Sequence, residues 1–128
     1  MWQMESLKRQ EDFKRCYKSG RSKANPYLVL YVCERKEAET GKQPLGRIGI
    51  SVSKKVGNSV VRHRIRRRIK ESYRLHEAAF NSGLDLVVVA RILAAEADYK
   101  TIESALLSLA ARHGILREKE SADAAASD

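Results

Sequence analysis

The sequence predicts a single α+β domain, and three observations support this fold class. The chain has 128 residues, of which 43% are hydrophobic and 32% charged, as is typical of one globular domain with one core. Three short segments are rich in β-branched and aromatic residues and therefore predict strands. Three other segments repeat apolar residues at helical spacing. In chain order the predicted elements are α-β-β-α-β-α.

The first predicted helix covers residues 9–19. Its side chains Phe13, Cys16 and Tyr17 are at helical spacing, and a glycine follows the helix as a stop. Residues 27–32, YLVLYV, predict the first strand because they are β-branched, aromatic or otherwise apolar and follow a proline.

The next segment, residues 34–46, is polar and contains glycine and proline. It predicts a mobile loop, with space for a further short strand near residues 40–46. Residues 47–53, RIGISVS, alternate between apolar and polar side chains, which predicts a strand packed on one face. The turn KKVGN follows, and Gly57 is expected there at a backbone angle that other residues avoid.

A strongly basic helix is predicted after this turn, with Asn58 or Ser59 as its N-cap. At about 100° per residue, one side of the helix must face the core. That side comprises Val61, Ile65, Ile69, Ser72 and Leu75. The opposite side comprises His63, Arg66, Arg67, Lys70 and Arg74, with Arg62 and Arg64 at its flanks.

The last third of the chain adds a strand and a helix. Residues 84–90, LDLVVVA, are a nearly continuous apolar run, which predicts a strand covered on both faces. Asp98 is the predicted cap of the last helix and Gly114 its stop. The apolar stripe of this helix comprises Ile102, Ala105, Leu106 and Leu109. Residues 115–128 lack an apolar pattern and predict a disordered tail, so we expect a single domain over residues 1–114.

Nearly all of the net charge lies in one segment. The chain has 25 Lys and Arg against 16 Asp and Glu, a net charge of +9. Residues 53–74 contain nine of the basic residues and one acid, or +8, which leaves 16 basic and 15 acidic residues, or +1, elsewhere. Cations at i and i+4 on a helix repel each other, and a polyanion relieves that repulsion. Arginine's planar fork suits phosphates, so the sequence predicts a nucleic-acid partner.

Two other interpretations of this basic helix agree less well with the sequence. A solvated face without a partner usually mixes both signs of charge, and Glu71 is the only acid in residues 53–74. An anionic membrane surface would need bulky apolar residues beside the cations, and this helix turns its apolar residues to the core.

The compartment is expected to be the cytoplasm. The N-terminus, MWQMESLKRQ, lacks the apolar run of a signal peptide, and no stretch approaches the roughly 20 apolar residues of a membrane span. The two cysteines, Cys16 and Cys33, lie in apolar patterns and are expected to be small buried side chains.

With these residues in view, the chain resembles the bacterial ribonuclease P protein component. IGISVSKKVGNSVVRHRIRRRIKE is similar to the family's signature of a Ser-Lys-Lys strand end, a Gly-Asn turn and an Arg-Asn-Arg helix. LKRQEDFKRCYKSGRS resembles the family's first helix, and DLVVVAR resembles its last strand. The resemblance runs from about Leu7 to Leu116. It implies the protein subunit of an endonuclease that removes 5′ leaders from precursor tRNA, in which an RNA subunit carries the catalysis.

The resemblance also implies a fold and a set of partners. The implied fold is a two-layer α/β sandwich with a four-stranded sheet and three helices, like a ribosomal-protein domain. Its βαβ crossover is left-handed, whereas about 98% of such crossovers are right-handed. The implied partners are the catalytic RNA and the leader of precursor tRNA. Mg²⁺ is implied as a cofactor bound mainly by the RNA, with no membrane and no small-molecule substrate expected.

Carried onto this chain, the family's positions form two sets. The catalytic-RNA-binding set comprises Lys54, Lys55, Asn58, Arg62, His63, Arg64, Arg66, Arg67 and Lys70. The leader-binding set comprises Phe13, Tyr17 and Tyr31, since single-stranded bases stack on aromatic rings. Core packing is the alternative role for these three rings.

Two positions depart from the family pattern. His63 stands where the family has asparagine, and Arg68 stands where an apolar residue is usual. Arg68 has a helical angle on the core side, so we expect its aliphatic stem to lie along the protein while its guanidinium reaches outward.

Two other classes of function remain open from the sequence. One is an RNA-binding domain of the ribosomal or translation-factor type, without a part in catalysis. The other is a DNA-binding domain, although the outer helix face lacks the Asn and Gln that read bases in the major groove. The three histidines are not spaced as a metal site, and Asp85 has no identifiable acid–base partner. We therefore expect no catalytic or metal-binding residue on the protein.

Overall fold

The computed structural model describes residues 5–6, 10–34, 47–80 and 83–116. The helices are α1 (Gln10–Ser19), α2 (Ser59–His76) and α3 (Tyr99–His113), with the short 3-10 helices η2 (Glu77–Ala79) and η3 (Ile92–Glu96). The strands are β1 (Glu5–Ser6), β2 (Arg21–Ala24), β3 (Leu28–Glu34), β4 (Arg47–Ser51) and β5 (Leu84–Ala90). Three helices and three of the strands thus confirm the predicted order.

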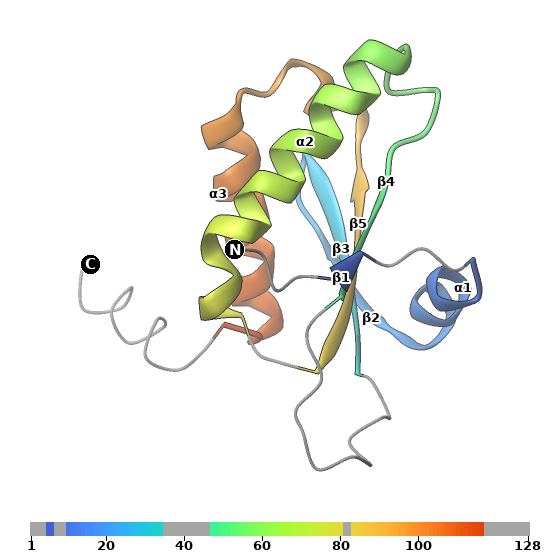
Figure 1. Cartoon of the computed structure of the whole chain (residues 1–128), viewed down its shortest axis with the longest axis vertical. Coiled ribbons are helices and arrows are strands. Elements are labelled where there is room, and N and C mark those ends of the chain that lie inside the picture. The colour runs from blue at the N-terminus through green and yellow to red at the C-terminus, as the bar shows by residue number, and fades with distance from the viewer. Residues whose placement is uncertain (1–4, 7–9, 35–46, 81–82, 117–128) are drawn as a thin grey trace.

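The strands form one mixed sheet in the order β1-β4-β5-β3-β2. β4 and β5 are parallel, whereas β3 runs antiparallel to both β5 and β2. The four strands β2 to β5 have four to seven residues each, and the two-residue β1 extends the sheet beside β4. α2 and α3 cover one face of the sheet, and α1 lies on the other face (Figure 1).

The crossover from β4 through α2 to β5 is left-handed, as the resemblance implies. Figure 1 views the sheet from its β1 edge, with β4 and β5 both running upward and α2 on the left. In the strand order β5 lies behind β4 in this view. A right-handed crossover would bring β5 to the near side of β4, so the general preference for right-handed units fails here.

The core lies between the sheet and the α2–α3 layer. Strand residues alternate between the two faces of the sheet, and those facing α2 and α3 are apolar. The fully or almost fully buried side chains of this core include Leu28, Leu30, Ile48, Ile65, Ile69, Leu86, Val88, Ile102, Leu106 and Leu109. The apolar stripe predicted for the last helix is therefore confirmed, and β5 is covered on both faces as predicted.

The core face of α2 differs from the prediction at one end. Leu75 was expected in the core but is 55% exposed, while Tyr73 is buried and packs its ring against Phe80 with centroids 4.9 Å apart. The stripe is centred between Ile65 and Ile69, and Leu75 falls farther round the helix from that centre than Tyr73 does.

Gly57 also differs from the expectation. Its φ is not positive, since Gly83 and Gly114 are the described glycines with that geometry. Instead, a Cβ at Gly57 would lie 2.7 Å from the side chain of Val61. A glycine is needed there because the turn passes close to the first turn of α2. Gly114, with φ of 71°, ends α3 as predicted.

The C-terminal end of the described domain lies slightly beyond the predicted one. Ile115 is buried and Leu116 forms a β-bridge with Phe80, so the described domain runs two residues past the predicted boundary at 114. The predicted loop and further strand within residues 35–46, and the tail from residue 117, lie outside the described residues.

Candidate RNA-binding surfaces

The turn before α2 holds the start of the helix in place. Asn58 is the N-cap, and its Oδ1 accepts a hydrogen bond from the backbone N of Val61 at 3.0 Å. Val56 is buried and anchors the turn, whereas Lys54 and Lys55 are exposed. Two lysines therefore stand at the N-terminal end of the helix, where they add to the positive end of its dipole.

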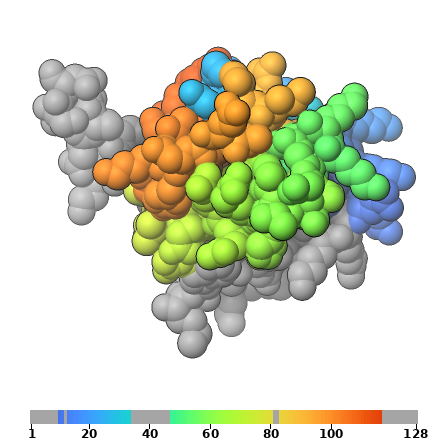
Figure 2. Space-filling view, turned by 90° about the horizontal axis from the view of Figure 1, so that it is seen from above, coloured from blue at the N-terminus to red at the C-terminus, as the bar shows by residue number. Residues whose placement is uncertain are grey.

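The outer side of α2 carries the predicted basic residues. His63, Arg64, Arg66 and Arg67 are exposed, while Arg62 and Lys70 are partly buried. The opposite side is held in the core by Ile65 and Ile69, both fully buried. Figure 2 shows α2 open to the surface along its length, with η3 and the start of α3 beside it. We call this surface, with the two lysines of the turn, the basic face.

The acid within this helix pairs with one cation near the C-terminal end of the basic side. Glu71 forms an ion pair with Arg74, one helical turn later. The hydrogen bond from Arg74 holds the pKa of the Glu71 carboxyl below its ordinary value. Glu71 is thus a carboxylate already engaged by an arginine that lies outside the predicted RNA-binding set.

Arg68 takes the path expected for an arginine on the core side of the helix. Its side chain is half-buried, and its Nη1 donates a hydrogen bond to the carbonyl oxygen of Ala97 at 2.5 Å. One turn earlier, Arg64 Nη2 lies 3.4 Å from the carbonyl oxygen of Ala95. Arg64 therefore reaches over η3, and Arg68 reaches over the segment that joins η3 to α3.

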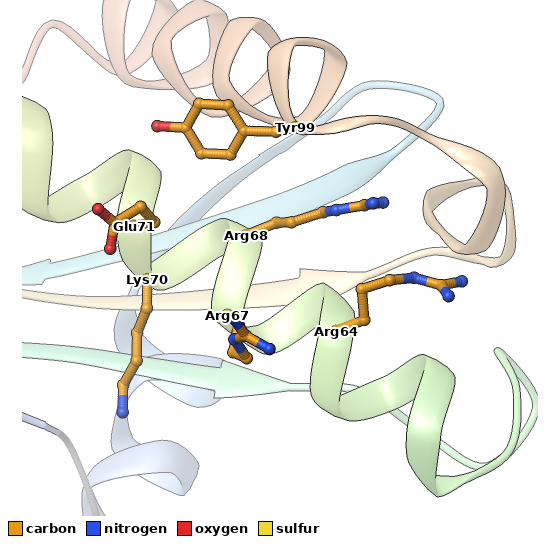
Figure 3. A pocket seen from close by; sticks show the side chains of 6 residues that line it. All are labelled: Arg64, Arg67, Arg68, Lys70, Glu71 and Tyr99. Atoms are coloured by element: carbon orange, nitrogen blue, oxygen red, sulfur yellow. The ribbon is translucent and has the colours of Figure 1, made fainter.

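A hollow of about 530 Å³ lies between α2 and the start of α3 (Figure 3). Its lining residues are Arg64, Arg67, Arg68, Lys70, Glu71 and Tyr99. Tyr99 comes from α3 and was not among the predicted site residues. No sequence signal points to it, because its place beside α2 depends on how the two helices pack.

The three predicted leader-binding rings come together on the other side of the sheet. Tyr17 and Tyr31 meet edge to face with centroids 4.9 Å apart, and Phe13 lies 6.3 Å from Tyr17 in a tilted arrangement. Tyr17 is 41% exposed, while Phe13 and Tyr31 are partly buried. We call this cluster of α1 and β3 the aromatic surface.

A small buried cluster supports the aromatic surface. Cys16, Cys33 and Val87 form it, and Phe13 and Tyr31 pack against it. Burial, and then the neighbouring Cys33, raise the pKa of the Cys16 thiol to about 12. The thiol is therefore protonated at neutral pH and acts as a small apolar side chain, as predicted.

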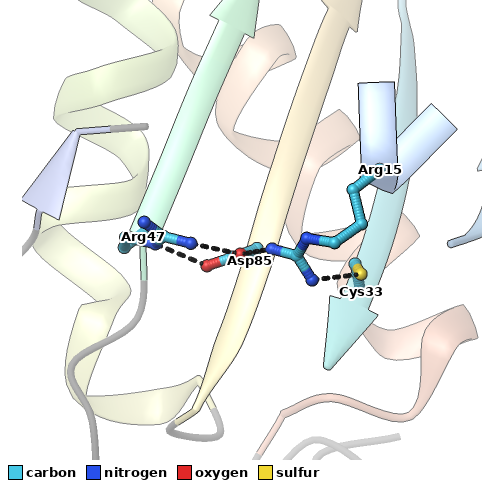
Figure 4. Close-up of polar contacts among 4 residues, drawn as sticks. All are labelled: Arg15, Cys33, Arg47 and Asp85. Atoms are coloured by element: carbon cyan, nitrogen blue, oxygen red, sulfur yellow. Dashed lines mark hydrogen bonds and ion pairs between the residues drawn. The ribbon is translucent and has the colours of Figure 1, made fainter. Parts of the chain in front are cut away.

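Asp85 has partners that the sequence did not reveal. It is fully buried in β5, and Arg47 of β4 binds it bidentately, with Nε at 2.8 Å from Oδ1 and Nη2 at 2.6 Å from Oδ2. Arg15 of α1 binds the same carboxylate and donates to Cys33 Sγ at 3.0 Å (Figure 4). The group ties α1, β4 and β5 together beside the aromatic surface.

Neither a metal-binding cluster nor a membrane-spanning helix is found among the described residues. Over residues 5–6, 10–34, 47–80 and 83–116, no group of three or more His, Cys, Asp or Glu side chains is placed to hold a metal ion. In the same ranges, no helix has the length and apolar character needed to cross a membrane.

Known proteins resemble this chain over most of its length. The family model described as Ribonuclease P matches residues 1–114. The ribonuclease P protein component of Lachnoclostridium phytofermentans is 53% identical over 116 residues, which cover 91% of this chain and 95% of that protein. The Staphylococcus aureus RNase P protein structure has a TM-score of 0.78 at 35% identity, covering 88% of this chain and 97% of that one. For the Thermotoga maritima RNase P protein, the TM-score is 0.73 at 28% identity, with 84% and 96% covered.

Proposed function

Because this chain belongs to the bacterial ribonuclease P protein family, we propose that its two surfaces bind two different RNAs. The basic face binds the catalytic RNA of the holoenzyme. The aromatic surface binds the single-stranded 5′ leader of precursor tRNA. Together they hold the substrate against the RNA that cleaves it.

The observation that carries this proposal is the one-sided charge of α2. Its inner side is locked into the core, so its cations cannot rotate away from one another. Their repulsion is relieved when phosphates bind, and the released counterions add to the affinity. The proposed contact residues are Lys54, Lys55, Asn58, Arg62, His63, Arg64, Arg66, Arg67 and Lys70. The Asn58 side-chain oxygen is engaged in capping, which leaves its NH₂ group to donate to RNA.

The aromatic surface has the chemistry that a leader needs. A leader differs in sequence from one precursor to the next, and every base has a flat face that can stack on an aromatic ring. Tyr17 has the most exposed ring of the three. Phe13 and Tyr31 are partly buried and pack against the cysteine cluster. Stacking without base-specific hydrogen bonds would let one surface accept many leaders.

The chemistry of cleavage is assigned to the RNA subunit. We propose that Mg²⁺ is bound mainly by the RNA, because phosphate oxygens are ligands that this hard cation prefers. The part of this chain is to bind, to orient the leader and to neutralise phosphates, which supports the binding of Mg²⁺ by the RNA.

The proposal is tested by reconstitution with a ribonuclease P RNA. At low magnesium, the purified protein is expected to raise the rate at which that RNA removes the leader from precursor tRNA. The protein freed of RNA is expected to leave the precursor intact. Cleavage by the RNA-free protein, or a rate unaffected by adding it, would contradict the proposal.

A further inference from the structure

The hollow between α2 and α3 is a candidate binding site beyond the two surfaces already proposed. We propose that it holds one unpaired nucleotide of the catalytic RNA, with the base on the Tyr99 ring and the phosphate between Arg64 and Arg68. This inference rests on the proposed function of the basic face and extends it to residues of α3 and to Arg68.

Arg64 and Arg68 form a prearranged pair of phosphate ligands. They lie one helical turn apart, and each contacts a backbone carbonyl, Arg68 that of Ala97 at 2.5 Å and Arg64 that of Ala95 in η3 at 3.4 Å. A guanidinium has five N–H donors, so these bonds leave further donors for an anion. Because the side chains are already ordered, binding a phosphate costs them less conformational entropy than it costs a free surface arginine.

The Tyr99 ring is also held in one orientation. Its hydroxyl donates to the Glu103 carboxylate at 3.4 Å, and His76 Nε2 lies 2.9 Å from the same Oε2 atom. The ring lines the hollow on the α3 side, with Arg68 and Glu71 across from it (Figure 3). It can therefore offer one face to a flat ligand.

The charges around the hollow favour an anion. Four cations line it against one acid, Glu71, which is already paired with Arg74. Asp98 also stands near Arg68, but its carboxylate caps α3 by accepting from the backbone N of Thr101 at 2.8 Å. Asp98 keeps its charge and interacts with Arg68, so the four cations face two acids in all and remain in excess.

Size and shape then select a single nucleotide. A volume of about 530 Å³ lies within the range of small-molecule sites. A base within a duplex has both faces covered by its neighbours, so only an unpaired nucleotide can stack on Tyr99. A cationic pair beside an aromatic ring matches the phosphate and base of such a nucleotide.

The test compares Tyr99→Leu with Tyr99→Phe in binding to the catalytic RNA. Stacking requires a ring, so the leucine variant is expected to raise Kd by about 5- to 150-fold, whereas the phenylalanine variant, which keeps the ring and loses only the bond to Glu103, should retain most of the affinity. Tyr27→Leu makes the same change outside the hollow and should also bind normally. Arg68→Gln should weaken binding, whereas Arg112→Gln, which loses a similar arginine–carbonyl bond elsewhere, should not.

Several outcomes would overturn the inference. If Tyr99→Phe loses as much affinity as Tyr99→Leu, the ring is not what binds. If Arg66→Ala weakens binding and Tyr99→Leu does not, the basic face stands and the hollow is not a site. If neither change matters, the proposed function fails as well.

A second measurement covers the case in which Tyr99→Leu lowers the melting temperature. A photoreactive benzoylphenylalanine at position 99 keeps an aromatic side chain and should crosslink to an unpaired nucleotide of the catalytic RNA. Crosslinks to precursor tRNA, to paired nucleotides only, or to no RNA would each contradict the inference.

Discussion

The rings of Tyr17 and Tyr31 join α1 to β3, edge to face, with their centroids 4.9 Å apart. The two residues do not have equal roles in this contact. Tyr17 is 41% exposed, whereas Tyr31 packs against the buried cluster of Cys16 and Cys33. Loss of either ring should therefore affect leader binding, but loss of Tyr31 should also affect stability.

Replacing Tyr17 by alanine is expected to weaken binding of leader-bearing precursor tRNA by roughly 1–3 kcal/mol, the value of one stacked base. Affinity for mature tRNA and for the catalytic RNA should stay near that of the wild type. Tyr31→Ala should weaken leader binding and also lower the melting temperature. Fluorescence titrations with the three RNAs and thermal unfolding measure this. An equal loss for all three RNAs with Tyr17→Ala would assign that ring to packing.

Reversing Arg66 and Arg67 to glutamate is expected to lower affinity for the catalytic RNA and to flatten its dependence on salt. The logarithm of the binding constant falls with the logarithm of salt in proportion to the phosphates neutralised. Filter binding across a salt series gives the slope. Arg112→Glu, a reversal on α3, should leave the slope unchanged. An affinity of the wild-type protein that barely responds to salt would exclude the basic face as the contact surface.

Asp85→Asn is expected to destabilise the protein by about 3 kcal/mol, at the low end of the cost of removing one partner from a buried ion pair. The low end applies because Arg15 and Arg47 keep partial access to water, with side chains 35% and 21% exposed. Urea unfolding measures the change. Glu96→Gln, at an exposed carboxylate, is the control and should have almost no effect. An equally small effect of Asp85→Asn would mean that the two arginines find other partners.

Acid is expected to destabilise the fold through His113. Its Nε2 donates to the carbonyl oxygen of Leu30 at 2.8 Å, and its buried Nδ1 faces no hydrogen-bond partner among the described residues. Burial lowers the pKa of His113 below 6.5 and outweighs the hydrogen bond to Leu30, which raises it; the nearby cations Arg21, Lys23 and Arg112 lower it further. The unfolded chain therefore takes up this proton more readily than the folded one.

The resulting stability is complete above about pH 6.5 and is lost as the pH falls through the lowered pKa. Urea unfolding over a pH series should show this decline. His113→Gln should remove most of it, because glutamine has an NH₂ donor and no titration in this range. His63→Gln, at an exposed position, should retain it. A decline of the same size in His113→Gln would assign the effect to other groups.

The sequence allowed most of the fold to be predicted, since the main elements have local signals. The alternation in β4, the apolar run of β5 and the caps Asn58 and Asp98 are all contained within a few neighbouring residues. β2 has no such signal. Its residues, RSKA, are all exposed, and they form a strand because they pair with β3 at the edge of the sheet.

Only part of the candidate site could be predicted from the sequence. The basic face follows from charge and helical spacing within one helix. The partners of Asp85 could not be found in this way, because Arg47 and Arg15 are 38 and 70 residues away and meet it only through strand register and the position of α1. Tyr99 enters the hollow for a similar reason, since the packing of α3 on α2 decides its neighbours.

The position of β5 has a consequence for synthesis of the chain. β5 lies between β3 and β4, and these two strands do not pair with each other. A nascent chain that ends before Leu84 therefore has a β2–β3 hairpin and a separate β4, with no continuous sheet for α2 to cover. Long-range pairing of this kind slows folding. Neither α1, with the rings proposed to bind the leader, nor the basic helix can pack on a complete sheet until the last third of the protein has left the ribosome.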